Sequence, residues 1–269
     1  MIKKIIHLSD VHIRNYKMHE QHKEVFNLFI KQIKKLRKEY SYNELRIVIA
    51  GDLFHQKITV SNEQFILGYT FLKACAKYCP VIVIAGNHDL LENNKERLDS
   101  ISPIIEVLND ENIKYFKNTG CYEDDNVVWC VYSVFESNIP PDIVKARNEF
   151  GDKLYVGLFH APVIGAKTDT NYNIEHGVNL TYFEGCDIVL LGDIHKRQKF
   201  ELNGCIMAFS GSLIQQNYGE TVSGHGYLIW DVAAKTYEEI SLESSYGFYK
   251  FEINSLDDLD NGTEKLVNK

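Results

Sequence analysis

The sequence predicts an α/β protein in which two mixed sheets pack face to face with helices outside. Short apolar runs alternate with helical patterns in the first half, and the second half is richer in strands. Polar residues of the kind that bind metals directly follow several of the apolar runs. Continuous apolar strands separated by helices are typical of a buried sheet that helices cover.

The first half alternates strand and helix. Apolar residues recur at helical spacing from Val25 to Leu36, which predicts an amphipathic helix. A second helix should end before Pro80, because proline cannot continue a helix. The predicted elements are strand 2–8, helix 21–40, strand 45–50, helix 62–77 and strand 81–85.

The second half contains several short apolar runs, which read as strands, and one plausible helix. The predicted strands are 127–135, 154–159, 188–191, 205–209, 226–232 and 238–242, and the predicted helix is 142–150. The stretch from Ser255 onward is rich in Asp, Asn and Gly, and we expect a frayed end or the beginning of another unit there.

Composition excludes several classes of protein. The chain has 269 residues, of which 45% are hydrophobic and 25% charged, so intrinsic disorder over most of its length is excluded. No apolar run approaches the roughly 20 residues of a membrane span, so we expect neither a secreted nor a membrane-embedded protein. The net charge of −8 argues weakly against nonspecific coating of nucleic acid, although not against an enzyme whose metal ions meet phosphate.

The six cysteines show no Cys-x-x-Cys spacing. A disulfide scaffold or a thiolate zinc site is therefore not expected, and the cysteines should be small buried hydrophobes in a reducing cytosol.

The most informative pattern is the position of Asp, Asn and His residues just after predicted strands. Ligands gather at the carboxyl ends of strands in open α/β sheets, where glycine allows a tight turn. The residues in these positions are Asp10, His12, Asp52, His55, Asn87, His88, His160, Asp193 and His195.

These residue types together favour a site for divalent ions. Carboxylate, carboxamide and imidazole suit manganese, iron or zinc better than magnesium alone, and Asp52 is the candidate for a carboxylate that bridges two ions. Each motif alone has a simpler explanation, since Asp caps turns and a lone histidine is usually a satisfied structural residue. Five such strand ends in one chain are improbable by chance, and they predict a common metal centre.

The same motifs resemble those of the calcineurin-like metallophosphoesterases and, within that superfamily, the DNA repair nucleases of the SbcD/Mre type. The resemblance covers residues 1 to about 250 and is carried by Asp10-x-His12, Gly51-Asp52-Leu53-Phe54-His55, Gly86-Asn87-His88-Asp89, His160 and Gly192-Asp193-x-His195. It implies a four-layer α/β/β/α metallophosphoesterase sandwich over 1–247. It also implies that 248–269 begins a truncated or rudimentary cap.

The resemblance assigns a role to each motif residue. Two divalent ions are implied, with Mn²⁺ favoured and Mg²⁺ or Fe²⁺ as other candidates. His88 would protonate the leaving group and His55 would orient or stabilise the phosphate, while a hydroxide activated by the two ions attacks phosphorus. The first ion would be held by Asp10, His12 and His195, the second by Asn87 and His160, and both by Asp52.

Asp193 departs from the family pattern, because it stands where the family has a histidine ligand of the second ion. A carboxylate can still bind a metal, and it would favour Mn²⁺ or Mg²⁺ over softer ions. We predict that Asp193 is a ligand, the alternative being that it only hydrogen-bonds.

The function implied is that of a metal-dependent DNA exo/endonuclease of recombination and repair. The implied partners are DNA and an SbcC/Rad-type ATPase subunit, with a homodimer as a further candidate and no membrane. A cytoplasmic location in a bacterium or a virus-infected host cell is expected. Lys196, Arg197 and Lys199 directly follow the last motif and are candidates for contact with the phosphate backbone. The alternative is a phosphodiesterase or phosphatase of the same superfamily that acts on a small molecule or a protein.

Overall fold

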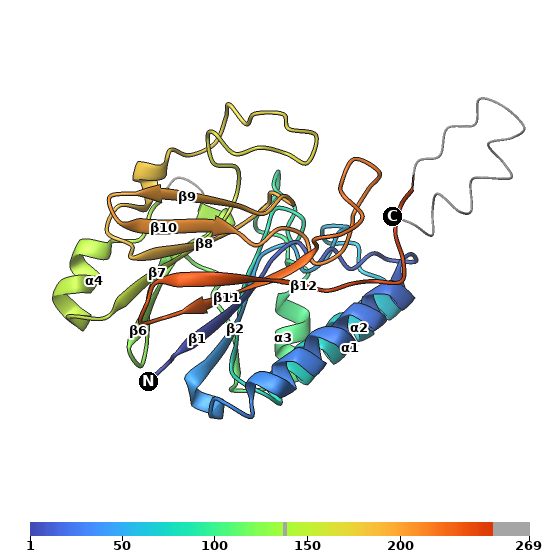
Figure 1. Cartoon of the computed structure of the whole chain (residues 1–269), viewed down its shortest axis with the longest axis horizontal. Coiled ribbons are helices and arrows are strands. Elements are labelled where there is room, and N and C mark those ends of the chain that lie inside the picture. Colours follow the sequence, from blue (N-terminus) through green and yellow to red (C-terminus); the bar gives the residue numbers. More distant parts are fainter. Residues whose placement is uncertain (137–138, 250–269) are drawn as a thin grey trace, which may run out of the picture.

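A computed structural model describes residues 1–136 and 139–249. Two six-stranded mixed sheets pack face to face and helices lie on the outside, so the predicted fold class is confirmed (Figure 1). The expected cap falls largely on 250–269, outside the described residues.

The first sheet has the strand order β12-β11-β1-β2-β3-β4. Its four strands β1 to β4 are parallel, and β11 and β12 extend it in antiparallel fashion at β1. The strands are β1 (Lys4–Leu8), β2 (Leu45–Ala50), β3 (Val81–Ile84), β4 (Ile113–Tyr115), β11 (Gly226–Asp231) and β12 (Thr236–Ser241).

The second sheet has the order β5-β6-β7-β8-β10-β9. Its parallel centre, β6-β7-β8-β10, is flanked by an antiparallel strand at each edge. The strands are β5 (Gly120–Asp124), β6 (Val127–Tyr132), β7 (Leu154–His160), β8 (Ile188–Gly192), β9 (Gln198–Leu202) and β10 (Cys205–Phe209).

The helices cover the outer faces of the two sheets. The α-helices are α1 (His19–Leu36), α2 (Asn62–Ala76), α3 (Ser102–Leu108) and α4 (Ile143–Phe150), and the 3₁₀ helices are η1 (Tyr42–Glu44), η2 (Val134–Glu136) and η3 (Leu180–Phe183). Helix α1 ends at Leu36 rather than Tyr40, because the amides of Lys38 and Glu39 bond three residues back and tighten the last turn. Strand β6 ends before Ser133, whose hydroxyl bonds the Lys117 carbonyl as the chain enters η2.

Three apolar layers hold the sandwich together. One lies between α1 to α3 and the first sheet, one lies between the two sheets, and one lies between the second sheet, α4 and η3. Trp129 and Trp230 fill the middle layer from opposite sheets and are fully buried. An ion pair also joins the sheets, since Arg46 of β2 donates two 2.8 Å hydrogen bonds to Asp124 of β5.

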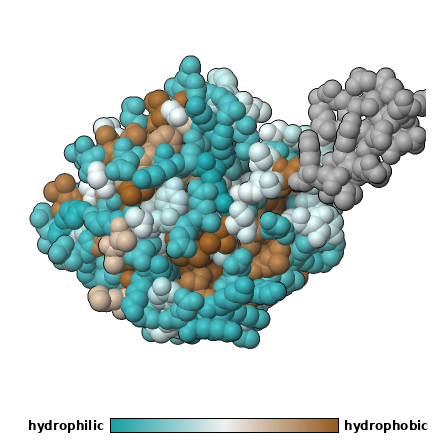
Figure 2. Space-filling model, viewed as in Figure 1, coloured by the Kyte–Doolittle hydropathy of each residue, from teal (hydrophilic) through white to brown (hydrophobic). Residues whose placement is uncertain are grey.

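The surface and the cysteines agree with these layers. Hydrophilic residues cover most of the face seen in Figure 2, and hydrophobic ones form separate patches. All six cysteines are free thiols and most are buried, as expected. Within the described part of the chain, no helix combines the length and apolar character that crossing a bilayer requires.

Candidate active site

The loops that follow five strands meet at one end of the sandwich. They follow β1, β2 and β3 of the first sheet and β7 and β8 of the second, all at the carboxyl ends of parallel strands. Main-chain hydrogen bonds join the first two loops, from the amide of Asp10 to Gly51 and from the amide of His12 to Asp52. The predicted motifs, far apart in sequence, therefore share one place.

Several site residues have unusual backbone conformations. Asp10, His12, Asp52 and Asp193 have φ values of 51°, 49°, 54° and 96°. Non-glycine residues rarely adopt positive φ, and such conformations concentrate at functional sites. The turns thus adopt strained backbone conformations, and these orient the side chains differently from those of a regular strand.

Two buried carboxylates lie at the centre of the site. Asp10 and Asp52 are 0% and 2% exposed. The Nε2 atom of His195 lies 3.6 Å from Asp10, and the Nε2 atoms of His12 and His160 lie 3.4 and 3.3 Å from opposite oxygens of Asp52. Asp52 therefore faces residues of both sheets.

The donor atoms form overlapping groups that could hold metal ions. In each group, one donor atom from every residue lies within 4.8 Å of the others. The groups are Asp10 with His12 and His195, Asp10 with Asp52 and His160, and His12 with His55 and His88.

Two buried atoms of the motif residues have no hydrogen-bond partner in the described part of the chain, and both are of ligand type. His160 donates from Nδ1 to the Ala50 carbonyl at 2.7 Å, which points its Nε2 toward Asp52 without a hydrogen bond. The Oδ1 atom of Asn87 is likewise buried without a partner. Buried polar atoms are normally satisfied, so these two fit divalent cations.

Gly86 keeps this space open. A Cβ atom at Gly86 would lie 2.1 Å from Oδ1 of Asp52 and 2.6 Å from Nε2 of His160. Any larger residue would displace the two donors that face each other.

Burial and mutual charge shift the pKa values of the central groups. Burial raises the pKa of Asp10. Burial opposes ionisation of Asp52 as well, yet His160 holds its pKa below the ordinary value. Burial disfavours the charged form of His160 too, but Asp52 raises the pKa of that imidazole. The two residues thus form a coupled pair of opposite charge.

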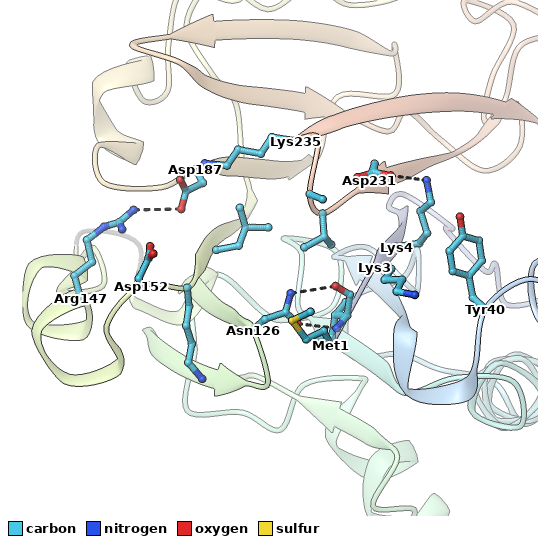
Figure 3. A pocket seen from close by; sticks show the side chains of 15 residues that line it. Met1, Lys3, Lys4, Tyr40, Asn126, Arg147, Asp152, Asp187, Asp231 and Lys235 are labelled. Atoms are coloured by element: carbon cyan, nitrogen blue, oxygen red, sulfur yellow. Dashed lines mark hydrogen bonds and ion pairs between the residues drawn. The ribbon is translucent and has the colours of Figure 1, made fainter.

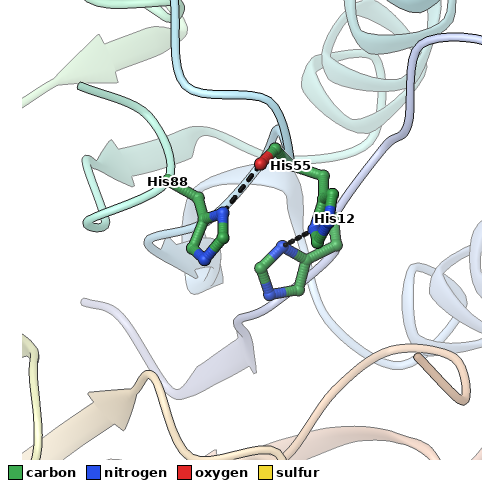
Figure 4. A group of neighbouring side chains, drawn as sticks. All are labelled: His12, His55 and His88. Carbon is green, nitrogen blue, oxygen red and sulfur yellow. Dashed lines mark hydrogen bonds between the residues drawn. The ribbon is translucent and has the colours of Figure 1, made fainter. Parts of the chain in front are cut away.

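His88 and His55 form the third donor group with His12 (Figure 4). His88 donates from Nδ1 to the His55 carbonyl at 2.7 Å, which fixes the ring and leaves Nε2 available to a substrate. His55 lies with its Nδ1 atom 3.2 Å from Nδ1 of His12. Its Nε2 accepts a 3.0 Å hydrogen bond from Arg14, and burial together with this guanidinium lowers the pKa of His55 to about 4.

Three supporting residues were missing from the predicted site. Asp89 accepts hydrogen bonds from the amides of Phe54 and Gly86, which ties the β2 and β3 loops together, and burial raises its pKa to about 7. Glu220 accepts a 2.8 Å hydrogen bond from Nδ1 of His195 and so frees Nε2 toward Asp10. Arg14 is the third. Asp89 stands within the Gly86-Asn87-His88-Asp89 motif and Arg14 follows His12 by two residues, so position could have marked both, whereas Glu220 lies 25 residues after His195.

Asp193 lies close to the centre without joining a donor group. Its amide donates to the Asp10 carboxylate at 3.1 Å. Its carboxyl is in none of the three groups found among the described residues, and burial raises its pKa to about 6 against the lowering effect of His160. Ligation by Asp193 stays a prediction.

The basic residues after the last motif are already engaged. Arg197 donates to the carbonyls of Ser210 and Ile240, so it fastens β12 to the site loop. Lys196 contacts Asn171 and Lys199 pairs with Glu201. Contact of these three with a phosphate backbone stays a prediction.

Residues 3–197 match the family described as calcineurin-like phosphoesterase. The chain belongs to this family. The sequence is 39% identical over 254 residues to an uncharacterized protein, R555, of Acanthamoeba polyphaga mimivirus, across 92% of this phosphoesterase and 18% of that protein. It is 24% identical over 263 residues to the SbcD component of the nuclease SbcCD of Staphylococcus epidermidis, across 85% of this phosphoesterase and 66% of SbcD. The phosphoesterase therefore spans less than two thirds of either relative.

A solved structure agrees with the fold. GAP50, the anchor in the inner membrane complex of Plasmodium, superposes with a TM-score of 0.53 at 12% identity, covering 97% of this phosphoesterase and 94% of that chain. This likeness concerns the fold alone.

Proposed function

We propose that this phosphoesterase is a metal-dependent DNA exo/endonuclease of recombination and repair. The observation that carries the proposal is the convergence of Asp10, Asp52 and His160 with a proton-donating His88 at the carboxyl ends of both sheets. The similarity to the staphylococcal nuclease component supports DNA as the substrate.

The donor set fits two divalent ions, for which Mn²⁺ is our choice and Mg²⁺ or Fe²⁺ the other candidates. We assign the first to Asp10, His12 and His195, the second to Asn87, His160 and Asp193, and both to Asp52. When bound, such ions would neutralise phosphate charge and lower the pKa of a water, so that hydroxide would be available to attack phosphorus.

The chain's own side chains supply positioning and a proton. His88, held through Nδ1 on the His55 carbonyl, donates a proton from Nε2 to the departing oxygen. His55 contacts a phosphate oxygen and is oriented by Arg14. Glu220 keeps His195 in the tautomer whose Nε2 can bind a metal.

The proposal extends to partners and place. An SbcC/Rad-type ATPase subunit would be the protein partner, a homodimer a further assembly, and Lys196, Arg197 and Lys199 contacts to the DNA backbone. Similarity to a protein of a giant virus supports a virus-infected host cell as the place of action, with a bacterial cytoplasm as the other candidate.

The alternative is a phosphodiesterase or phosphatase acting on a small molecule or a protein. The engagement of Lys196 and Lys199 with their own neighbours favours it, because free cations are what a DNA backbone requires.

A substrate panel tests the proposal. Purified protein is assayed on linear single- and double-stranded DNA, cyclic nucleotides and a phosphoprotein, each with Mn²⁺, Mg²⁺ or chelator. Cleavage of DNA alone, abolished by chelator, is expected. Hydrolysis of a cyclic nucleotide or phosphoprotein without DNA cleavage would establish the alternative.

A further inference from the structure

A cavity of about 490 Å³ is lined by none of the motif residues and is not used by the mechanism above. Its walls come from the loop before α1, from the start of α1 and from the segment after β12. The side chains that matter here are Tyr16, Met18, Gln21, Tyr246 and Phe248.

Exposed aromatic rings gather around this cavity. Tyr16 is 80% exposed and Tyr246 is 50% exposed, although both line it. Tyr218 is also exposed and packs edge to face against Phe248, with ring centroids 5.1 Å apart. Large exposed aromatic surface is costly in water, and its concentration at one place points to a ligand with flat rings.

The wall of the cavity is held in position rather than left loose. The side chain of Gln215 pairs with both main-chain groups of Phe248, accepting from its amide at 2.6 Å and donating to its carbonyl at 3.1 Å. Gln215 belongs to the same loop as Glu220, which orients His195. The cavity is thus connected to the catalytic centre through a single loop.

Arg14 lies between His55 of the proposed centre and His19, which lines the cavity. Its guanidinium donates to Nε2 of His55 at 3.0 Å and to Oε1 of Gln216 at 3.2 Å, while its carbonyl bonds His19 at the cavity. It makes no ion pair with any carboxylate in the described ranges, unlike Arg46 and Arg147. A half-buried cation of this kind suits a phosphate group.

We infer that the cavity receives an unpaired base of single-stranded DNA, stacked on Tyr16 and Tyr246, while Arg14 contacts the neighbouring phosphate. The inference rests on the proposed nuclease function and specifies its substrate. A base inside a duplex has both faces covered by its neighbours, whereas an unpaired base can stack on an aromatic side chain.

The test compares the affinity of the protein for an oligonucleotide that carries bases with its affinity for an abasic one. The full-length protein is titrated, in chelator to prevent cleavage, against a fluorescent oligothymidylate of about ten nucleotides and against the matching abasic oligomer. Fluorescence anisotropy gives both dissociation constants. The wild type should bind the base-containing oligomer about tenfold more tightly, because stacking on one or two rings has that effect.

Variants assign the difference to the two rings. In the double variant Tyr16→Ala/Tyr246→Ala the ratio of the two constants should fall close to one, and in Tyr16→Phe/Tyr246→Phe it should persist. Ile66→Ala, an exposed position on α2, should keep the wild-type ratio. Because each ratio is internal to one variant, a smaller active fraction in one sample does not change it, and the phenylalanine variant separates loss of the rings from loss of the fold.

Two outcomes overturn the inference. A ratio that the double alanine variant does not change would mean that the cavity serves another occupant, such as a peptide segment. Equal affinity of the wild type for the base-containing and abasic oligomers would likewise mean that no base occupies the cavity. If the protein nevertheless cleaves DNA with Mn²⁺, the inference alone fails. If it neither cleaves DNA nor binds the oligomers, the proposed function fails with it.

Discussion

The two ends of the sandwich contrast in how their charges are satisfied. The amino-terminal ends of the strands border a cavity of about 580 Å³, in which Lys4 pairs with Asp231 and both Arg147 and Lys235 pair with Asp187 (Figure 3). At the carboxyl ends, buried carboxylates and imidazoles face each other, and His160 retains an orphan nitrogen. The larger cavity is therefore not the better site, because most of its charges already have partners.

The origin of the contrast is local. At the amino-terminal end, charged groups neutralise each other across strand ends at 2.7 to 3.2 Å. At the carboxyl end, the residues with positive φ values and the small Gly86 allow carboxylate and imidazole atoms to lie close together. The close approach of these metal-ligating atoms becomes energetically favourable only when a ligand supplies positive charge.

Asp52→Asn should have the largest effect among the substitutions that test the difference between the two ends. Loss of the carboxylate shared by both sheets should abolish hydrolysis of a test phosphodiester and lower metal affinity more than 100-fold, since changes to the partners of metal ligands alone cost about 10- to 100-fold. Hydrolysis with Mn²⁺ and metal titration measure this. Asp187→Asn, at the opposite end, is the matched control and should leave both values within about twofold. Equal losses of hydrolysis and metal affinity in the two variants would show that the carboxyl end is not the special one.

His88→Ala separates chemistry from metal binding. Removal of the proton donor should lower kcat by about 10²- to 10⁴-fold while metal stoichiometry stays at the wild-type value. Single-turnover cleavage and metal analysis check the two parts. His176→Ala, an exposed histidine away from the motifs, should be silent. Full activity of His88→Ala would contradict the assigned role.

The sequence predicted which motif residues lie close together better than it predicted the residues that hold them in position, for physical reasons. Asp10, Asp52 and His160 could be located because each lies within two residues of the end of an apolar strand, a pattern visible locally. Glu220 escaped because its role depends on a 25-residue separation from His195 that only the folded loop reveals. Arg197, by contrast, looked free in sequence but is bound to the Ile240 carbonyl of a distant strand.

The same reasoning explains the elements that were missed. Strand β4 is three residues long and β5 is only half-buried, so neither carries a continuous apolar run. Strand β9 alternates polar and apolar residues as an edge strand does, yet it follows a motif so closely that it resembled a binding loop. Helix α3 has seven residues, too few for a helical stripe to stand out.

Asp124→Asn tests the link between the sheets rather than the site. Breaking the buried pair with Arg46 should lower the free energy of unfolding by about 3 kcal/mol. Burial opposes the charge, but Arg46 holds the pKa of Asp124 below its ordinary value. The contribution is therefore present above the unfolded pKa near 4 and is lost as pH falls through the lower folded pKa. Urea unfolding of wild type and variant should converge in acid, and a constant difference would contradict this account.

Asp193→Ala decides the one departure from the family pattern. If its carboxylate is a ligand, the variant should bind one Mn²⁺ tightly and the second about tenfold or more weakly than the wild type. Calorimetric titration gives the stoichiometry. Asp193→His, which restores the family residue, should recover two-ion binding. Unchanged two-ion occupancy in Asp193→Ala would limit Asp193 to the hydrogen bond from its amide to Asp10.

Glu220→Gln should give the smallest effect. The glutamine can still accept from Nδ1 of His195 but loses the negative charge that, against burial, raises the pKa of that imidazole to about 9. We expect first-ion affinity to fall about tenfold, as for other partners of metal-bound histidines, with little change in the second ion. Competition against a chelating dye separates the two ions. Because Glu220 belongs to the loop that holds Phe248, weaker binding of both ions would mean that the whole loop has shifted, whereas weaker binding of the first ion alone identifies a charge effect on His195.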